Sequence, residues 1–351
     1  MSKILVIIPT FDNGPTLRPA IHGVLHQSEQ DVQVVVIGDG APPSTDSLMD
    51  EMCAADHRVH YVPRPKSPRT GEPYRDEIIR ATDAEFVLYS SDDDIWMPDH
   101  AEVLCRALAD HDLAATLSIG VNDRLYLSRM DYSDPTDRAL ELTESRVGLT
   151  ESGHRMDSYL RLPVGWRTAP PGRYTDHWMW CQWLEQPWVR ATTVPEWTVV
   201  HIPKPLRLGV PGPDREKEQW RWAEEFSSPD WRQRRSGLLR AALLEERRTY
   251  ERHANGLESH LKAATSRLDE MATQLAAESA LRVEAEQRLG AETTARLLAE
   301  ERLTAESAGH DRTATSLLAI ESSRTWITAQ RLARVSGWNS IRRRIHRPDR
   351  R

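Results

Sequence analysis

The segment EFVLYSSDDDIWMP, residues 85–98, decides the fold that this chain is expected to adopt. Residues 85–90 form an apolar run bounded by polar residues, which predicts a buried strand. The carboxylates of Asp92, Asp93 and Asp94 follow it directly. Their mutual repulsion is costly unless a cation or a hydrogen-bonding ligand compensates it, and hard oxygen donors suit Mg²⁺ or Mn²⁺. A solvated loop with an acidic helix cap, for which Asp99 is well placed, explains this segment equally well.

Short apolar runs and amphipathic stretches alternate along the residues around this segment. Strands are predicted at residues 3–8, 32–37 and 58–62. Helices are predicted around residues 17–25, with Thr16 as a cap, and around 48–53, 74–82 and 103–108. This alternation predicts an α/β fold, a mostly parallel sheet with helices on both faces.

In such a sheet, ligands bind beyond the carboxyl ends of the strands. Three predicted strand ends carry unusual polar residues: PTFD at residues 9–12, GDG at 38–40 and SDDD at 91–94. We expect all three to face one crevice.

Charge and cysteine content exclude several classes of protein. The 351 residues carry a net charge of −7, which gives no global attraction to nucleic acid or membrane. Cys53, Cys105 and Cys181 form no CxxC pair, which argues against a zinc site or a disulfide framework and fits a reducing compartment. The N-terminal apolar run is too short for a signal peptide, and no run reaches the ~20 apolar residues that span a bilayer. We expect a cytoplasmic protein.

The chain after residue 118 divides into three stretches of different composition. Residues 119–230 are irregular and rich in tryptophan, and we expect Trp180, Trp183 and Leu184 to lie in a core rather than in a sugar-stacking wall. Residues 236–318 contain no proline and predict a long helix. Residues 319–351 form a basic amphipathic tail, which suits an anionic membrane surface or merely solubilises the chain.

The long helix carries a heptad seam, which predicts a homodimeric coiled coil. The seam consists of Leu257, Leu261, Ala264, Leu268, Met271 and Leu275. Beyond Leu275 it degrades, because Arg282 and Arg296 occupy positions in register with it.

Several of these motifs, in their order and spacing, resemble glycosyltransferase family 2, with its A-type nucleotide-sugar fold, over residues 3 to about 205. The opening ILVIIPTFDN, residues 4–13, resembles the family's first strand and Pro-Thr-Tyr-Asn turn, where Thr10 and Phe11 match positions that contact the nucleotide base. VVVIGDG, residues 34–40, resembles the Val-Asp-Asp-Gly turn. Gly38 replaces its first aspartate, and Asp39 matches the second, which accepts hydrogen bonds from uracil.

The acid-bearing segment resembles the family's Asp-x-Asp metal motif, followed by Trp-x-Pro. Aligned on Trp96 and Pro98, Ser91 stands in place of the first aspartate. The resemblance then implies that Asp93 binds the metal and that Asp92 reaches the ribose. Arg75 matches the arginine of an Ala-Arg-Asn stretch near the diphosphate, with a solvated arginine as the alternative.

RYTDH, residues 173–177, resembles the family's Glu-Asp segment, with Thr175 in place of the glutamate. Asp176 matches the catalytic base, and a helix cap is the alternative interpretation. His201 is a possible late metal ligand, and a plain surface histidine is the more ordinary interpretation.

The resemblance implies an inverting, metal-dependent glycosyltransferase that moves a sugar from a nucleotide-diphosphate donor, such as a UDP-sugar, to an acceptor hydroxyl. Residues 1–230 would form its catalytic domain, with 1–118 binding the nucleotide and 119–230 the acceptor. The acceptor would be a glycan or lipid-linked molecule of envelope or polysaccharide synthesis, at the inner face of the cell membrane. Three departures from family acids, Gly38, Ser91 and Thr175, motivate an alternative, which is an inactive scaffold acting through its coiled coil. An oxidoreductase is disfavoured because the glycines at 38 and 40 do not extend to GxGxxG.

Overall fold

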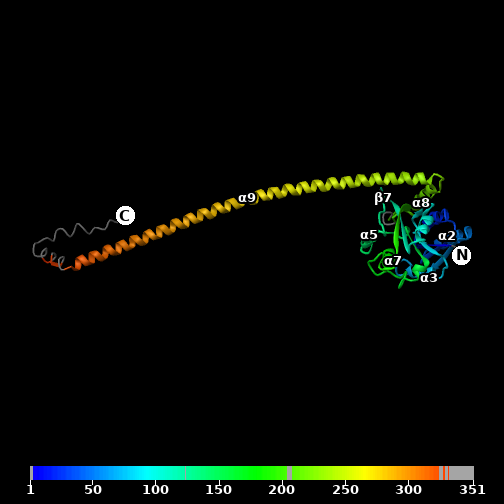
Figure 1. Ribbon diagram of the computed structural model, residues 1–351, viewed down its shortest axis with the longest axis horizontal. Coiled ribbons are helices and arrows are strands. Elements are labelled where there is room, and N and C mark those ends of the chain that lie inside the picture. The colour runs from blue at the N-terminus through cyan, green and yellow to red at the C-terminus, as the bar shows by residue number, and fades with distance from the viewer. Residues whose placement is uncertain (1–2, 123, 204–207, 324–326, 329–330, 332–351) are drawn as a thin grey trace. The chain divides into compact units, whose positions relative to one another are not determined.

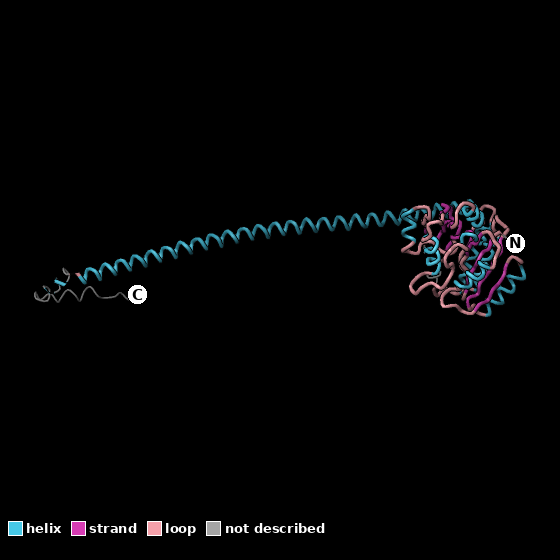
Figure 2. The backbone as a smooth tube through the Cα atoms, turned by 60° about the horizontal axis from the view of Figure 1, so that its bottom comes forward, coloured by secondary structure: helices cyan, strands magenta, loops and turns pink. Residues whose placement is uncertain are grey.

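The computed structural model describes residues 3–122, 124–203, 208–323, 327–328 and 331, and it contains two compact units, Met1–Asn255 and Gly256–Arg351. The first unit holds a mixed, mostly parallel sheet with helices on both faces, and a long helix follows it (Figures 1 and 2). The predicted fold class is therefore confirmed. None of the described helices is both long enough and apolar enough to cross a bilayer.

The sheet has a parallel half and a mixed half. The parallel half consists of four neighbouring strands: β3 (Val59–Arg64), β2 (Val32–Asp39), β1 (Ile4–Thr10) and β4 (Phe86–Tyr89). The mixed half continues from β4 through the antiparallel strand β8 (Ser152–Arg155), then β6 (Leu113–Val121), β9 (Ala191–His201) and β5 (Ile95–Trp96). A short strand, β7 (Leu125–Leu127), pairs with β6.

Alternate residues of the central strands bury against helices on opposite faces, as the two-residue period of a strand requires. Ile4 and Val6 of β1 lie in the apolar cluster with α1 (Gly14–Leu25), α2 (Pro43–Ala55) and α4 (His100–Leu108). Leu5 and Ile7 lie in the other cluster, with α3 (Glu72–Arg80), α6 (Met156–Tyr159) and α7 (Thr175–Leu184). A seventh helix of this unit, α5 (Pro135–Glu141), precedes β8.

The expected burial of the tryptophans on α7 is confirmed. Trp180 and Trp183 are fully buried, and Leu184 is 7% exposed. All three belong to the cluster that holds one face of the parallel strands. They therefore hold the sheet in place and cannot form an exposed sugar-stacking wall.

The predicted cap of the first helix is wrong. Asn13, not Thr16, occupies the N-cap position of α1, and the Thr16 hydroxyl donates to the Asn13 carbonyl at 2.8 Å from inside the first turn. Asp99 does stand at the N-cap of α4, but its side chain makes no capping hydrogen bond. It accepts two hydrogen bonds from Arg235 Nη1, at 2.9 and 3.0 Å.

The predicted helix at 236–318 lies within α9 (Trp231–Ser322), which is 92 residues long. Its first turns pack in the first unit, where Trp231 and Ala242 join Trp222 and Phe226 of α8 (Gly212–Ser227). In the second unit the leucines of the heptad seam are exposed, by 65–70%. The predicted tail lies mostly outside the described residues, so its membrane contact stays a prediction.

Candidate functional site

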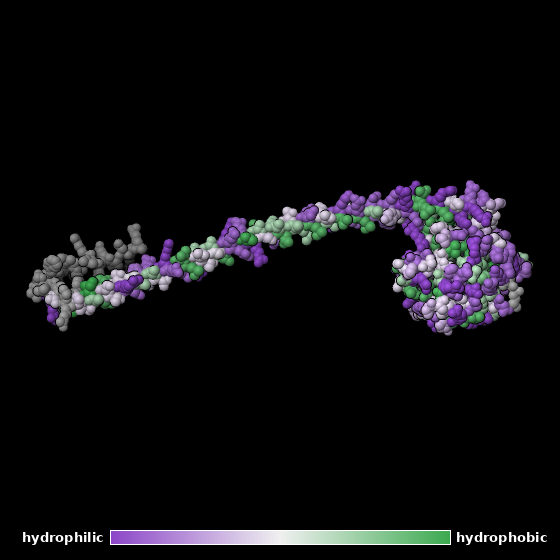
Figure 3. All heavy atoms as spheres, viewed as in Figure 1, coloured by the Kyte–Doolittle hydropathy of each residue, from purple (hydrophilic) through white to green (hydrophobic). Residues whose placement is uncertain are grey.

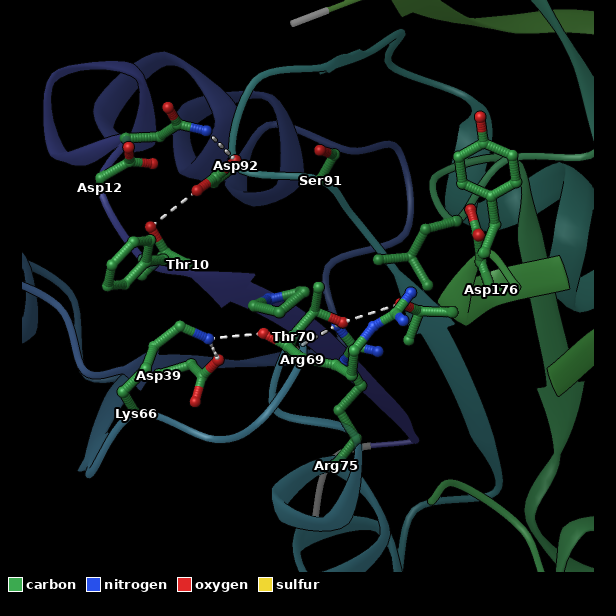
Figure 4. Close-up of a pocket in the computed structure, with 16 residues that line it drawn as sticks. Thr10, Asp12, Asp39, Lys66, Arg69, Thr70, Arg75, Ser91, Asp92 and Asp176 are labelled. Atoms are coloured by element: carbon green, nitrogen blue, oxygen red, sulfur yellow. Dashed lines mark hydrogen bonds and ion pairs between the residues drawn. The ribbon is translucent and has the colours of Figure 1, made fainter. Parts of the chain in front are cut away.

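The carboxyl ends of β1, β2 and β4 meet at a pocket of about 430 Å³ (Figure 4). Residues from distant parts of the chain line it, including six that the sequence singled out: Thr10, Phe11, Asp39, Arg75, Asp92 and Asp176. The two predicted metal ligands, Asp93 and His201, are not among the lining residues. The expected crevice at the sheet edge therefore exists, and it contains the proposed nucleotide and base positions.

Asp39 is buried at the floor of the pocket and is already hydrogen-bonded. Its Oδ1 accepts from the Ser67 backbone N–H at 2.6 Å, and its Oδ2 accepts from Ser67 Oγ at 3.0 Å and Lys66 Nζ at 2.6 Å. A carboxylate has about four acceptor positions, so one is left for a ligand N–H. The Lys66 side chain is 40% exposed, whereas that of Asp39 is only 3% exposed. Lys66 is therefore the partner that can move away and free an acceptor position on Asp39 for a ligand. Lys66 Nζ also lies 5.0 Å from the ring centre of Phe11, which is 45% exposed.

Gly38, where the resembled family has an aspartate, has no room for a side chain. A Cβ at this position would lie 2.3 Å from Tyr61 Oη. The Tyr61 hydroxyl donates to Asp46 Oδ1 at 2.6 Å, which holds the ring in place. Tyr61 therefore fills the volume that a side chain at position 38 would need, and packing explains this departure.

Arg75 brings a buried positive charge to the pocket. It is 3% exposed, its Nη2 donates to the Thr70 carbonyl at 2.8 Å, and its guanidinium carbon lies 4.6 Å from the centre of the Trp166 ring. Burial lowers the pKa of Arg75, and the nearby Glu72, Tyr89, Asp176 and Asp39 oppose that shift. Its Nε has no hydrogen-bond partner among the described residues. A solvated arginine, the alternative interpretation, does not fit this burial.

Asp176 stands in the first turn of α7, at the wall of the pocket. The N-cap residue is Tyr174, which makes no side-chain capping bond, so Asp176 is not the cap. Its carboxylate accepts the His177 backbone N–H at 3.0 Å. Burial raises the pKa of Asp176, against the lowering effects of that hydrogen bond and of the Arg75 charge. A raised pKa makes a carboxylate a stronger base.

The three adjacent acids are buried, each 3–7% exposed, so the interpretation as a solvated loop is wrong. Asp92 points into the pocket (Figure 4). Its Oδ2 accepts from Thr10 Oγ1 at 2.7 Å, and its Oδ1 accepts from Asn13 Nδ2 at 2.8 Å. These two bonds tie the turn after β4 to the turn after β1.

Asp93 faces α8, where a cation of the protein itself lies nearby. Its Oδ1 accepts from Ser91 Oγ at 2.6 Å, and its Oδ2 lies 3.7 Å from Arg215 Nη2. Arg215 Nη1 also donates to Asn13 Oδ1 at 3.1 Å. Burial, together with the charges of Asp92 and Asp94, raises the pKa of Asp93 to about 7. No motif in the sequence indicated Arg215.

Asp94, which is buried, forms an ion pair with the partly exposed His201. His201 Nδ1 lies 3.0 Å from Asp94 Oδ1, and Asp94 also accepts from Thr150 Oγ1 at 2.5 Å and from the Ile202 backbone N–H at 2.9 Å. Burial alone would lower the pKa of His201, but the charge and hydrogen bond of Asp94 raise it to about 10. A metal ion that binds the His201 imidazole would therefore have to displace its proton, so the role of His201 as a late metal ligand stays a prediction.

No set of three or more His, Cys, Asp or Glu side chains in the described part of the chain is arranged to hold a metal ion. The donors present are nevertheless of the kind that Mg²⁺ and Mn²⁺ prefer, namely the Asp93 carboxylate and the Ser91 hydroxyl. Burial and the charges of Asp92 and Asp94 disfavour the ionised form of Asp93, and a cation bound beside it would offset this effect. These residues therefore fit a divalent ion that is coordinated by one protein carboxylate, with the other coordination positions filled by oxygens of a bound ligand such as a diphosphate.

The loop between β3 and α3 supplies pocket residues that were not predicted: Lys66, Arg69 and Thr70. Arg69 Nη2 donates to the Arg173 carbonyl at 2.6 Å, and Thr70 Oγ1 donates to Thr175 Oγ1 at 3.2 Å, which links this loop to the start of α7. A signal was present, because β3 is parallel to β2 and its carboxyl end reaches the same sheet edge.

Parts of this chain are similar in sequence to known proteins. The Succinoglycan biosynthesis protein ExoW of Rhizobium meliloti is 31% identical over 102 residues, which are 28% of this chain and 32% of that protein. The Polyprenol monophosphomannose synthase of Mycolicibacterium smegmatis is 38% identical over 73 residues, which are 20% and 27% of the two chains. The chain thus spans about a third or less of these curated relatives.

Among solved structures, S. aureus TarS 1-349 in complex with UDP is similar, with a TM-score of 0.44 and 15% identity. The match covers 65% of this chain and 73% of that chain. Residues 5–152 match the family model described as Glycosyl transferase family 2, and they include β1, β2, β4 and the acidic triplet. Residues 5–152, which lie within the first compact unit, are therefore similar in sequence to glycosyltransferase family 2.

Proposed function

We propose that the chain transfers a sugar, with inversion, from a nucleotide-diphosphate donor to an acceptor hydroxyl. One observation carries the proposal, which is that a single pocket combines an exposed aromatic ring, a buried carboxylate, cationic side chains and a carboxylate of raised pKa. A nucleotide sugar presents a flat base, a diphosphate and a reacting carbon, which these groups could bind. The pocket volume of about 430 Å³ lies within the range of ligand sites.

The nucleotide would lie along the β1–β2 side of the pocket. The ring of Phe11 offers a face for base stacking, and the free acceptor position of Asp39 suits the N–H of a pyrimidine such as uracil. Lys66 would turn from Asp39 toward the diphosphate, a movement that its exposure permits. Arg75, with its unpartnered Nε, supplies a second positive charge.

Asp176 would act as the general base. The acceptor hydroxyl attacks the anomeric carbon, its proton passes to the Asp176 carboxylate, and the bond from that carbon to the diphosphate breaks. Burial keeps the pKa of Asp176 raised, so it holds the proton better than a solvated aspartate. Arg75 stabilises the charge that grows on the leaving diphosphate.

Asp93 would hold Mg²⁺ or Mn²⁺ against the diphosphate, with Ser91 beside it. A bound divalent ion supplies charge stabilisation for the leaving group. Arg215 lies 3.7 Å from Asp93 and already provides part of this positive charge. The arginine and an added ion would therefore compete for the same carboxylate.

Replacing Arg215 by methionine is expected to tighten Mn²⁺ binding about 10-fold, because the change removes a like charge near the ion. Calorimetric titration of Mn²⁺ into the protein, with a saturating nucleotide present, measures the change. Arg221→Met is the matched control, since Arg221 is an exposed arginine of the same helix that contacts Trp222. Weaker Mn²⁺ binding in Arg215→Met would show that the arginine holds the site together.

The acceptor would be a glycan or lipid-linked molecule. The relatives named for succinoglycan biosynthesis and for polyprenol monophosphomannose synthesis motivate this class. The basic tail would bring the enzyme to the inner face of the membrane, where such acceptors lie. Liposome binding that is unchanged after deletion of residues 322–351 would contradict this placement.

Nucleotide binding tests the proposal first. Titration with UDP and Mn²⁺ is expected to give a measurable Kd, and Phe11→Ala is expected to weaken it by about 10–100-fold through lost stacking. Leu160→Ala removes a side chain of similar exposure, 51%, outside the pocket and should leave the Kd unchanged. A panel of nucleotide sugars, screened for hydrolysis, then identifies the donor. Absence of binding by any nucleotide would favour the scaffold alternative.

A further inference from the structure

The exposed part of α9 contains a repeat of 14 residues. Residues 275–288, LAAESALRVEAEQR, and residues 289–302, LGAETTARLLAEER, are identical at half of their positions. Figure 3 shows apolar side chains recurring among polar ones along this helix. Fourteen residues are two heptads, so the repeat preserves the seam and varies it in a regular way.

The seam consists of two series of positions, each with a spacing of seven, and every member is exposed. The first series carries only apolar and basic residues: Leu268, Leu275, Arg282, Leu289, Arg296, Leu303, His310 and Leu317. The second series carries apolar, small and acidic residues: Met271, Glu278, Ala285, Glu292, Ala299, Glu306, Thr313 and Ile320. Basic residues never occur in the second series, nor acidic ones in the first. The arginines at in-register positions therefore follow a rule and do not mark a decaying seam.

This segregation bears on the direction of pairing. In a parallel pair in register each seam residue meets its own copy, which would bury Arg282 against Arg282 and Glu292 against Glu292. Such layers place like charges together in a desolvated interface. In an antiparallel pair the first series of one helix packs against the second series of the other, so basic residues can meet acidic ones.

We infer that residues 268–320 of α9 pair antiparallel with the same residues of a second copy of this chain. One alignment places all three basic residues of the first series, Arg282, Arg296 and His310, opposite Glu306, Glu292 and Glu278 respectively. The same alignment packs large side chains against small ones at the centre, with Leu289 opposite Ala299.

The remaining layers of this alignment carry no charge and contain one leucine each. They pair Leu303 with Ala285, Leu317 with Met271, Leu268 with Ile320 and Leu275 with Thr313. The leucines of these layers are 57–66% exposed in the single chain, so pairing removes apolar surface from water.

Charges beside the seam are arranged within each helix. Arg282 Nε lies 3.1 Å from Glu286 Oε1, and Arg296 Nε lies 3.1 Å from Glu300 Oε1, so the two repeats make the same ion pair. In the antiparallel alignment Glu286 approaches Glu300 of the second copy at the solvent edge. That contact costs little, because exposed charges are screened and each glutamate already has its own arginine.

Disulfide trapping tests the direction and the alignment. In a Cys53→Ser background, which removes the partly exposed cysteine of α2, Leu289→Cys and Ala299→Cys are made separately in the full chain. Oxidation of a mixture of the two variants is expected to give a cross-linked dimer, while each variant alone gives none. A dimer from Leu289→Cys alone would show parallel pairing, and no dimer in any sample would reject the alignment.

Charge exchange tests the same layers without cysteine. Arg282→Glu together with Arg296→Glu is expected to weaken the dimer by on the order of 100-fold in sedimentation equilibrium, because four layers then hold two carboxylates. Adding Glu306→Arg and Glu292→Arg is expected to restore it. A parallel pair would respond to neither change in this way, and a chain that is monomeric at micromolar concentration before any substitution would overturn the inference.

Discussion

Asp176→Asn is expected to lower the rate of sugar transfer by about 10²–10⁴-fold, the usual range for removing a general base. The amide cannot take the proton of the acceptor hydroxyl, while the donor contacts proposed for Phe11, Asp39 and Arg75 would stay in place. Donor affinity is therefore expected to change little. Initial rates with the donor found in the nucleotide-sugar panel, and the Kd of the free nucleotide, measure the two effects separately.

The acidic limb of the pH–rate profile gives a second readout of this role. The base works in its ionised form, and burial raises the pKa of Asp176. As the pH is lowered, we therefore expect the rate to begin to fall at a pH above the usual pKa range of an aspartate. This decline should be absent in Asp176→Asn. Glu185→Gln, which makes the same chemical change at an exposed position just beyond the other end of α7, is the control. Undiminished transfer by Asp176→Asn would remove this residue from the mechanism.

Asp94→Asn is expected to lower the free energy of unfolding by about 1–3 kcal/mol, because it removes the charged partner of the partly exposed His201. Asparagine also offers a poorer acceptor to Thr150 and to the backbone of Ile202, which both bind Asp94. Urea denaturation of the wild type and the variant measures the loss as a change in midpoint. Asp110→Asn, an exposed aspartate after α4, should change stability by less than about 0.5 kcal/mol.

The pH dependence of this pair has a definite sign. The pKa of His201 rises from 6.5 to about 10 on folding. Its contribution to the free energy of unfolding is therefore complete below pH 6.5 and is lost as the pH rises through 10. The pKa of Asp94 is held below its ordinary value by His201 and by its other hydrogen bonds, against the effect of burial. Its contribution is lost only in acid. A variant as stable as wild type at pH 7 would show that Asp94 and His201 are not a charged pair.

The strands and the pocket residues that could be predicted are those that local sequence patterns and short motifs indicate. Apolar runs such as residues 34–37 locate the parallel strands. The rule that ligands bind at the carboxyl ends of strands then predicts from the sequence that Thr10, Asp39 and Asp92 lie close together, as they do in the pocket. The family motifs add Arg75 and Asp176, which line the same pocket.

The unpredicted part depends on contacts between distant segments. Strand β8 has the polar sequence SGHR, so no apolar run predicts it. It nevertheless pairs antiparallel with both β4 and β6 and lies between them. Arg215 reaches Asp93 from a helix more than 100 residues later. The ion pair of Asp94 with His201 is equally remote in sequence. Periodicity and short motifs carry no information about such partners.

The close packing of Tyr61 on Gly38 has an evolutionary consequence. An ancestor or relative with aspartate at position 38 needs a smaller side chain at position 61, because both cannot occupy the same space. We therefore expect substitutions at positions 38 and 61 to occur together in related sequences. The absence of an acid at position 38 therefore has a packing explanation and is not by itself a sign of decay.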